Sequence, residues 1–119
     1  MDKKVLKWLY DVKVSIDEIN SYFSNEEMDF LEYKKNFMRK RAVERNLEII
    51  GEAINRIIKT DIAIASKISD SIAIVGLRNQ VIHAYDNISD ETIWAILTNH
   101  LPKLKVEIDT LLENATPQL

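Results

Sequence analysis

Apolar side chains recur at alternating steps of three and four residues along most of this 119-residue chain. On a helix this spacing gathers them on one face, so the pattern predicts amphipathic helices. The chain has only two glycines and two prolines, whereas a β-rich fold would need more turn residues. The stripes fall in residues 5–23, 37–59, 70–87 and 89–113. They predict an all-α, up-and-down bundle of four main helices plus a short helix.

Capping residues predict where several of these helices begin. Asn25 is a suitable N-cap for the short helix, which would then continue through Leu31. Asp61 is expected to cap a single turn, and Ser89 to cap the last helix. The beginnings of the helices are therefore predicted more closely than their ends.

Two residues interrupt otherwise regular helical patterns. Pro102 lies inside the last helix and removes one backbone donor, so a kink is expected there. Gly51 lies in the middle of the third helix, where it costs up to about 1 kcal/mol relative to alanine. A close approach of another helix is the usual reason for such a glycine, and it is expected here, at a dimer interface for example.

Length and composition limit the class of protein. The chain fits a single domain, expected over residues 1–113, with a frayed tail at residues 114–119. It has no cysteine, which excludes disulfides and thiolate metal sites. No apolar run is long enough to cross a bilayer, and the N-terminus lacks the apolar core of a signal peptide. We therefore expect a cytoplasmic protein without membrane contact.

Charge limits how the chain could contact nucleic acid. The net charge is −3, so any such contact must be local rather than spread over the whole surface. One stretch concentrates cations, namely Lys34, Lys35, Arg39, Lys40, Arg41 and Arg45. Its ordinary interpretation is a solvated helix face, and its functional interpretation is a local patch that binds nucleic acid.

Three glutamates recur at four-residue steps on the third helix, which raises the question of a metal site. Glu44, Glu48 and Glu52 could in principle supply carboxylate ligands. Helical di-metal sites also need a histidine three residues after a glutamate, and neither histidine of this chain has one. We expect no metal and no cofactor, and we expect these glutamates to pair with arginines along the helix, namely Arg41, Arg45 and Arg56.

The segment of residues 74–85 contains the candidate catalytic side chains. It places Arg78, Asn79, His83 and Tyr85 among apolar neighbours. An imidazole has an unperturbed pKa near about 6.5 and exchanges protons at neutral pH, and a guanidinium binds phosphate oxygens. The amide of Asn79 can orient either group. This set suits metal-free cleavage of RNA, in which His83 removes the 2′-OH proton and Arg78 stabilises the charge that grows on phosphorus.

Helix geometry constrains how the two groups could act together. A five-residue step turns a straight helix by about 500°, which leaves positions 78 and 83 about 140° apart. Either the helix distorts near His83, or two chains combine their groups across a dimer axis. Apolar stripes at heptad steps are compatible with such a dimer. A plainer interpretation also exists, in which His83 is a core residue and Tyr85 packs with its hydroxyl at the rim.

The segment Gly76-Leu77-Arg78-Asn79-x-x-x-His83-x-Tyr85 resembles the signature of HepT toxins, a branch of the HEPN superfamily. Residues 42–53 (AVERNLEIIGEA) contain the Ile-Gly-Glu-Ala element of the same family, and Trp94 followed by Leu101-Pro102-x-Leu104 is a third match. The resemblance covers nearly the whole chain in the right order.

The resemblance implies a HEPN helical bundle that forms a homodimer, with Arg78 and His83 as catalytic residues and Asn79 as their supporting polar residue. Such toxins cleave RNA without metal. Their partner in a type VII pair is an MNT-type nucleotidyltransferase antitoxin, which transfers AMP to the tyrosine that corresponds to Tyr85. The substrate would be transfer RNA or messenger RNA, drawn toward the cleft by cationic residues, for which Arg39, Lys40, Arg41 and Arg45 are the candidates.

Two other functions remain open from the sequence. The chain could be a non-catalytic HEPN subunit that binds a nucleotidyltransferase and presents substrate or nucleotide to it. It could also be a helical oligomerisation domain. The presence of Arg78, Asn79, His83 and Tyr85 together favours the enzyme over both.

Overall fold

The computed structural model describes residues 1–23, 29–83 and 89–115, and within the fifth helix it leaves the side chains of Arg78 and residues 80–83 undescribed. Every regular element in these ranges is helical. In chain order they are α1 (Lys3–Ser21), α2 (Phe30–Lys35), α3 (Phe37–Thr60), α4 (Ile62–Ala65), α5 (Ser71–His83), α6 (Asp90–Ala95), the π-helical turn η1 (Ile96–His100) and α7 (Leu101–Ala115). Because α6, η1 and α7 follow one another directly, they form one long last helix. This helix, with α1, α3 and α5, makes the four main helices that the sequence predicts.

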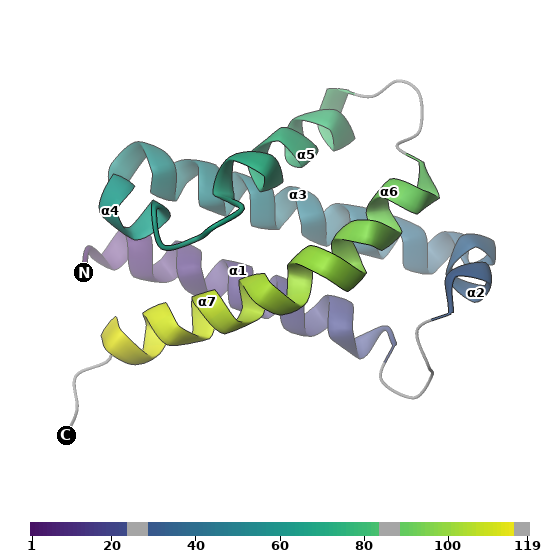
Figure 1. Cartoon of the computed structure of the whole chain (residues 1–119), viewed down its shortest axis with the longest axis horizontal. Coiled ribbons are helices and arrows are strands. Elements are labelled where there is room, and N and C mark those ends of the chain that lie inside the picture. Colours follow the sequence, from purple (N-terminus) through teal and green to yellow (C-terminus); the bar gives the residue numbers. More distant parts are fainter. Residues whose placement is uncertain (24–28, 84–88, 116–119) are drawn as a thin grey trace.

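The long helix α3 lies at the centre of the molecule (Figure 1). It packs against α1 on one side and against α5 on the other, and α7 packs against α1. The short helices α2 and α4 lie near opposite ends of α3. The molecule measures 45 × 32 × 19 Å, so it is about two helices thick. None of the described helices has both the length and the apolar character needed to span a membrane.

The predicted apolar stripes form the core. Their residues are almost completely buried: Val5, Leu9, Val12, Ile16 and Ile19 on α1; Val43, Leu47, Ile50, Ile54 and Ile57 on α3; and Ile93, Leu97, Leu101, Leu104, Ile108 and Leu111 on the last helix. Burying one such side chain contributes roughly 1.5–3 kcal/mol. The three- and four-residue spacing therefore identified the buried face of these three helices correctly.

Two of the predicted helix caps are confirmed, and the predicted extent of the short helix is wrong. The Asp61 carboxylate accepts from the Ile64 amide at 3.1 Å, and the Ser89 hydroxyl accepts from the Thr92 amide at 3.1 Å. The short helix does not run from Asn25 through Leu31, because Asp29 has an extended backbone and caps α2 itself. Its carboxylate accepts from the Leu31 amide at 2.8 Å. Asn25 lies outside the described residues.

Pro102 distorts the last helix, although not as a simple kink. The turn that precedes it is π-helical, and the Leu101 amide donates to the carbonyl of Ile96, five residues earlier. A proline ring collides with the carbonyl four residues before it in a regular α-helix. Widening that turn is one of the recognised ways to accommodate the ring, since π-turns occur as short insertions within α-helices. The sequence therefore located the distortion, and the structure shows its form.

Aromatic rings close the end of the bundle next to α2. Trp94 of α6 lies 5.4 Å from Tyr33, 5.6 Å from Phe30 and 6.1 Å from Phe23, measured between ring centroids. These contacts join the end of α1 and the whole of α2 to α6. They hold the beginning of α6 beside the first turns of α3. Gly51 of α3 is buried within its own chain.

Candidate active site

Helix α5 carries three of the four residues that the sequence singles out. Arg78, Asn79 and His83 all lie on its backbone, which is α-helical through His83. The Asn79 side chain is exposed. The side chains of Arg78 and His83, and the whole of Tyr85, lie outside the described residues. Since the backbone stays α-helical, positions 78 and 83 of one chain are about 140° apart around the helix.

The inward face of α5 packs on α3, and its outward face is exposed and partly apolar. Ile74 and Leu77 are buried, whereas Ile72 is 82% exposed. Gly76 and Asn79 are also exposed. Position 83 follows the exposed residues Ile72, Gly76 and Asn79 by eleven, seven and four positions. These steps are close to whole turns of the helix, so position 83 falls on the same outward face.

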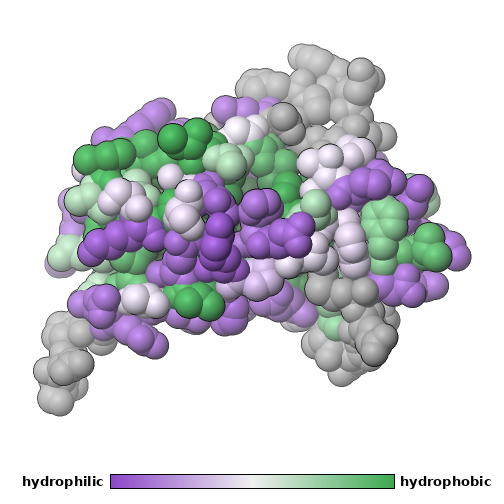
Figure 2. Space-filling model, in the orientation of Figure 1, coloured by the Kyte–Doolittle hydropathy of each residue, from purple (hydrophilic) through white to green (hydrophobic). Residues whose placement is uncertain are grey.

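Gly76 has no packing partner among the described residues that would explain its lack of a side chain. A Cβ atom placed on it would meet none of their atoms within 4 Å. Figure 2 shows apolar side chains over α4 and the beginning of α5. Ile62 of α4 is 69% exposed and Ile72 of α5 is 82% exposed. Both helices therefore present apolar side chains to solvent.

The cationic stretch is divided among several local contacts. Lys40 bonds both carboxylate oxygens of Asp90 at 2.9 and 3.1 Å, and both side chains are only 18% exposed. Arg45 pairs with Glu48 at 3.2 Å, and the Arg39 guanidinium lies 5.0 Å from the centre of the Phe23 ring. The structure therefore does not gather these cations into one uniformly positive patch.

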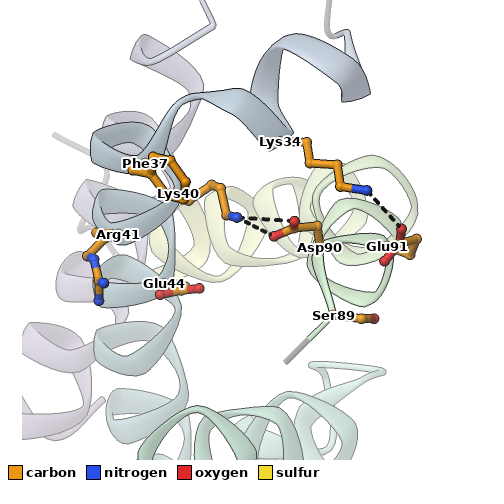
Figure 3. A pocket seen from close by; sticks show the side chains of 8 residues that line it. All are labelled: Lys34, Phe37, Lys40, Arg41, Glu44, Ser89, Asp90 and Glu91. Atoms are coloured by element: carbon orange, nitrogen blue, oxygen red, sulfur yellow. Dashed lines mark hydrogen bonds and ion pairs between the residues drawn. The ribbon is translucent and has the colours of Figure 1, made fainter. Parts of the chain in front are cut away.

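A polar cleft of about 300 Å³ lies between the first turns of α3 and the beginning of α6 (Figure 3). Phe37, Arg41 and Glu44 line it from α3, and Asp90 and Glu91 line it from α6. The pair of Lys40 with Asp90 crosses it and joins the two helices. Ser89 also lines the cleft, six residues after His83, so the cleft lies near the end of the motif segment.

Residues 12–111 match the family described as "Ribonuclease HepT-like". The chain belongs to this HepT-like ribonuclease family. It is 36% identical over 110 residues to "Putative RNase MJ1380" of Methanocaldococcus jannaschii, covering 92% of this chain and 98% of that protein. It is 31% identical over 115 residues to "Putative RNase MJ0125" of the same organism, covering 96% and 97%. "Putative RNase TTE0752" of Caldanaerobacter subterraneus subsp. tengcongensis is 30% identical over 72% of this chain and 76% of its own length. No solved structure matches the sequence closely.

The glutamates of α3 in this member of the HepT-like family differ in their contacts. Glu48 pairs with Arg45 and Glu52 with Arg56, each at 3.2 Å, as the sequence predicts. Glu44 is half-buried and makes no hydrogen bond or ion pair to any described residue. The expected pairing with arginine is therefore confirmed for two glutamates and does not extend to Glu44.

A polar clamp that the sequence did not reveal holds the beginning of α5 in this HepT-like fold. Asp70 receives hydrogen bonds from Lys103 Nζ at 2.8 Å and pairs with His100 Nδ1 at 2.9 Å. One residue earlier, the amide and hydroxyl of Ser69 both donate to Glu107. The bond from Lys103, followed by that with His100, lowers the pKa of the Asp70 carboxyl below its ordinary value. The clamp joins residues about thirty positions apart, and no local pattern marks it.

Proposed function

We propose that this chain is a metal-independent endoribonuclease that acts as the toxin of a HepT-type toxin–antitoxin pair. Arg78, Asn79 and His83 would form its active site, and AMP transfer to Tyr85 would silence it. Membership of the ribonuclease family is the observation that carries this proposal, because the matched residues 12–111 contain the whole motif. The relatives named as RNases cover nearly the full length of the chain.

The chemistry needs only groups that the motif supplies. The imidazole of His83 would take the proton of a ribose 2′-OH, which then attacks the adjacent phosphorus. The Arg78 guanidinium would stabilise the negative charge that develops on the phosphate oxygens, and Asn79 would orient one of the two groups. The leaving 5′-oxygen takes up a proton, and the products carry a 2′,3′-cyclic phosphate and a 5′-hydroxyl.

Two features of α5 support a site that is completed by a second copy. The α-helical backbone keeps positions 78 and 83 far apart around one helix, which favours the arrangement in which two chains combine their groups. Position 83 also shares its face with Ile72 and Gly76, which none of the described residues covers. A homodimer that covers this face would bring both copies of His83 to one shared cleft.

Silencing by AMP follows from the position of Tyr85, two residues after His83. An added nucleotidyl group would place negative charge and bulk where the RNA phosphate has to bind. The group would come from an MNT-type nucleotidyltransferase acting as antitoxin. Among the proposed RNA-binding residues Arg39, Lys40, Arg41 and Arg45, the exposed Arg41 is the best placed, because Lys40 and Arg45 are held by carboxylates.

The deciding experiment is RNA cleavage in the presence of EDTA, with intact-mass measurement to ensure that Tyr85 carries no AMP. Wild type should cleave and leave 2′,3′-cyclic phosphate ends, and His83→Ala should lose roughly a hundredfold or more of the rate. His100→Ala is the matched control, because it removes the other histidine, and it should keep most of the activity. Since His100 also belongs to the clamp at the beginning of α5, circular dichroism has to show that its helical content is unchanged. If unmodified wild type and His83→Ala are equally inactive, the non-catalytic partner of a nucleotidyltransferase becomes the better conclusion.

A further inference from the structure

The cleft between α3 and α6 has a chemistry that the motif on α5 does not use. Of its other acidic groups, Asp90 is held by Lys40, and the exposed Glu91 lies 4.0 Å from Lys34 Nζ. Arg41 and Glu44 remain, and neither bonds to another described residue. The cleft therefore offers a guanidinium and a carboxylate that are both available to a ligand.

Glu44 provides a hydrogen-bond acceptor for a ligand in this cleft. Its side chain points from α3 into the space in front of Ser89 (Figure 3). It is half-buried, so water competes for its oxygens less than at an open surface. An ionised carboxylate only accepts hydrogen bonds, and it has two oxygens side by side. It therefore suits a ligand that presents two neighbouring N–H donors.

Phe37 provides an aromatic ring on which a planar ligand could stack. It lines the cleft and is 71% exposed, which is unusual for a phenylalanine at the beginning of a long helix. Lys40 Nζ lies 5.2 Å from the ring centre and fixes the ring by a cation–π contact. A planar base can stack on the exposed part of the ring. Proteins that bind single-stranded nucleic acid combine such aromatic surfaces with cations that hold the phosphates.

We propose that this cleft binds one guanine nucleotide of single-stranded RNA. The base stacks on Phe37, its imino and amino groups donate to Glu44, and a neighbouring phosphate binds Arg41. Guanine is the standard base whose Watson–Crick edge carries two adjacent donors, whereas the other three place an acceptor beside each donor. That the polymer is RNA rests on the proposed function, while the preference for guanine rests on the cleft.

The position of the cleft suits a nucleotide that flanks the cleavage site. Ser89 lines the cleft and follows His83 by six residues, which even a fully extended chain spans in no more than about 20 Å. A short RNA strand can therefore occupy the cleft and reach α5 at the same time. The cleft would then select which phosphate is placed at the motif.

The test measures binding without cleavage. Fluorescent uridine pentanucleotides with guanosine, adenosine, cytidine or uridine at the centre are titrated into His83→Ala protein, and anisotropy gives the dissociation constants. The oligonucleotide with guanosine should bind about tenfold more tightly than the others, as expected for hydrogen bonds to a charged acceptor. Glu44→Gln should abolish that preference. Phe37→Ala should weaken binding of all four by about tenfold through lost stacking, and Arg41→Ala should weaken all four and reduce their salt dependence.

Matched controls separate the cleft from general effects on charge and folding. Met38→Ala removes an apolar side chain that is 86% exposed, directly beside Phe37 but not in the cleft. Lys59→Ala removes an exposed cation from the other end of α3. Both should bind like the parent protein, and circular dichroism should show the same helical content for every variant.

Equal affinity for the four oligonucleotides, or a guanine preference that survives Glu44→Gln, would overturn the proposal. So would unchanged RNA affinity in all three cleft variants, which would leave Phe37 as a contact for a protein partner. The ribonuclease assignment fails independently of these results. Wild-type protein that selects guanine but never cleaves would contradict that assignment and leave the cleft proposal standing.

Discussion

Helices α3 and α5 pack against each other, yet the polarity of their solvent-facing sides differs. Beyond its first turn, where Phe37 and Met38 are exposed, the outward face of α3 is polar, with Arg45 paired to Glu48 and Glu52 to Arg56. The outward face of α5 begins with Ile72, which is 82% exposed, and continues with Gly76. A helix that is apolar on all sides is normally covered on all sides. Beyond its first turn, α3 therefore exposes mainly paired charged side chains, whereas α5 presents an exposed apolar face suited to contact with a second chain.

Two isoleucines give the strongest test of this difference. Ile54 of α3 is completely buried, so Ile54→Ala should lower the free energy of unfolding by roughly 2–5 kcal/mol. Ile72→Ala should change the stability of a single chain by no more than about 0.5 kcal/mol, because its side chain is exposed. Urea denaturation measures both effects, and sedimentation equilibrium should show weaker self-association for Ile72→Ala alone. Unchanged self-association would contradict an interface on α5.

Two tyrosines at the closed end of the bundle differ in whether their hydroxyl groups have a hydrogen-bond partner. Tyr33 is fully buried, its hydroxyl has no hydrogen-bond partner in the described structure, and burial raises its pKa. Removing an unsatisfied buried group is favourable, so Tyr33→Phe should stabilise the protein by about 1 kcal/mol. Tyr22→Phe is the matched change, because the Tyr22 hydroxyl accepts from Asn46 at 3.0 Å, and it should destabilise. Thermal unfolding of both variants would decide, and a loss in Tyr33→Phe would show that its hydroxyl is satisfied.

The two glycines distinguish the two helices by a smaller effect. Gly76→Ala should raise the stability of a single chain by up to about 1 kcal/mol, since an added Cβ meets nothing and alanine favours the helix. Gly51→Ala should destabilise, because Gly51 is buried against its own chain. The free energy of unfolding is measured at low and at high protein concentration. Gly76→Ala should raise it only at low concentration, because the added Cβ would disturb the proposed contact with a second chain at high concentration. A gain at both concentrations would mean that no second chain approaches Gly76.

The clamp at the beginning of α5 gives a pH-dependent test. The folded state lowers the Asp70 pKa below 3.8, so the resulting stabilisation is present above that pH and is lost as the pH falls through the folded-state pKa. Asp70→Asn should therefore be less stable than wild type at neutral pH, and the difference should shrink below about pH 4. Denaturation across that range is the measurement, with Asp11→Asn as control, since Asp11 pairs with Lys7 on α1 and is not part of the clamp. A difference that stays constant with pH would exclude the carboxylate as its cause.

The sequence by itself determined the helices and most of what they bury. Apolar spacing is a local property with the period of the helix, so it identified the core residues of α1, α3 and the last helix before any contact was known. Caps such as Asp61 and Ser89 are equally local, and so is the distortion near Pro102. The motif of residues 76–85 indicated the family because its residues lie close together in the sequence.

Tertiary structure decided the features that depend on distant residues. The short helix begins after Asp29 and not at Asn25, at the point where Phe30 and Tyr33 pack on Trp94. Lys40 pairs with Asp90, fifty residues later in the chain, so its sequence neighbours give no sign of this ion pair. The cleft that the pair spans has no local sequence pattern either. The same holds for the exposed face of α5, since its apolar residues resemble those of a buried helix. Periodicity shows which residues of a helix are apolar, but only packing shows which of its faces the chain leaves open.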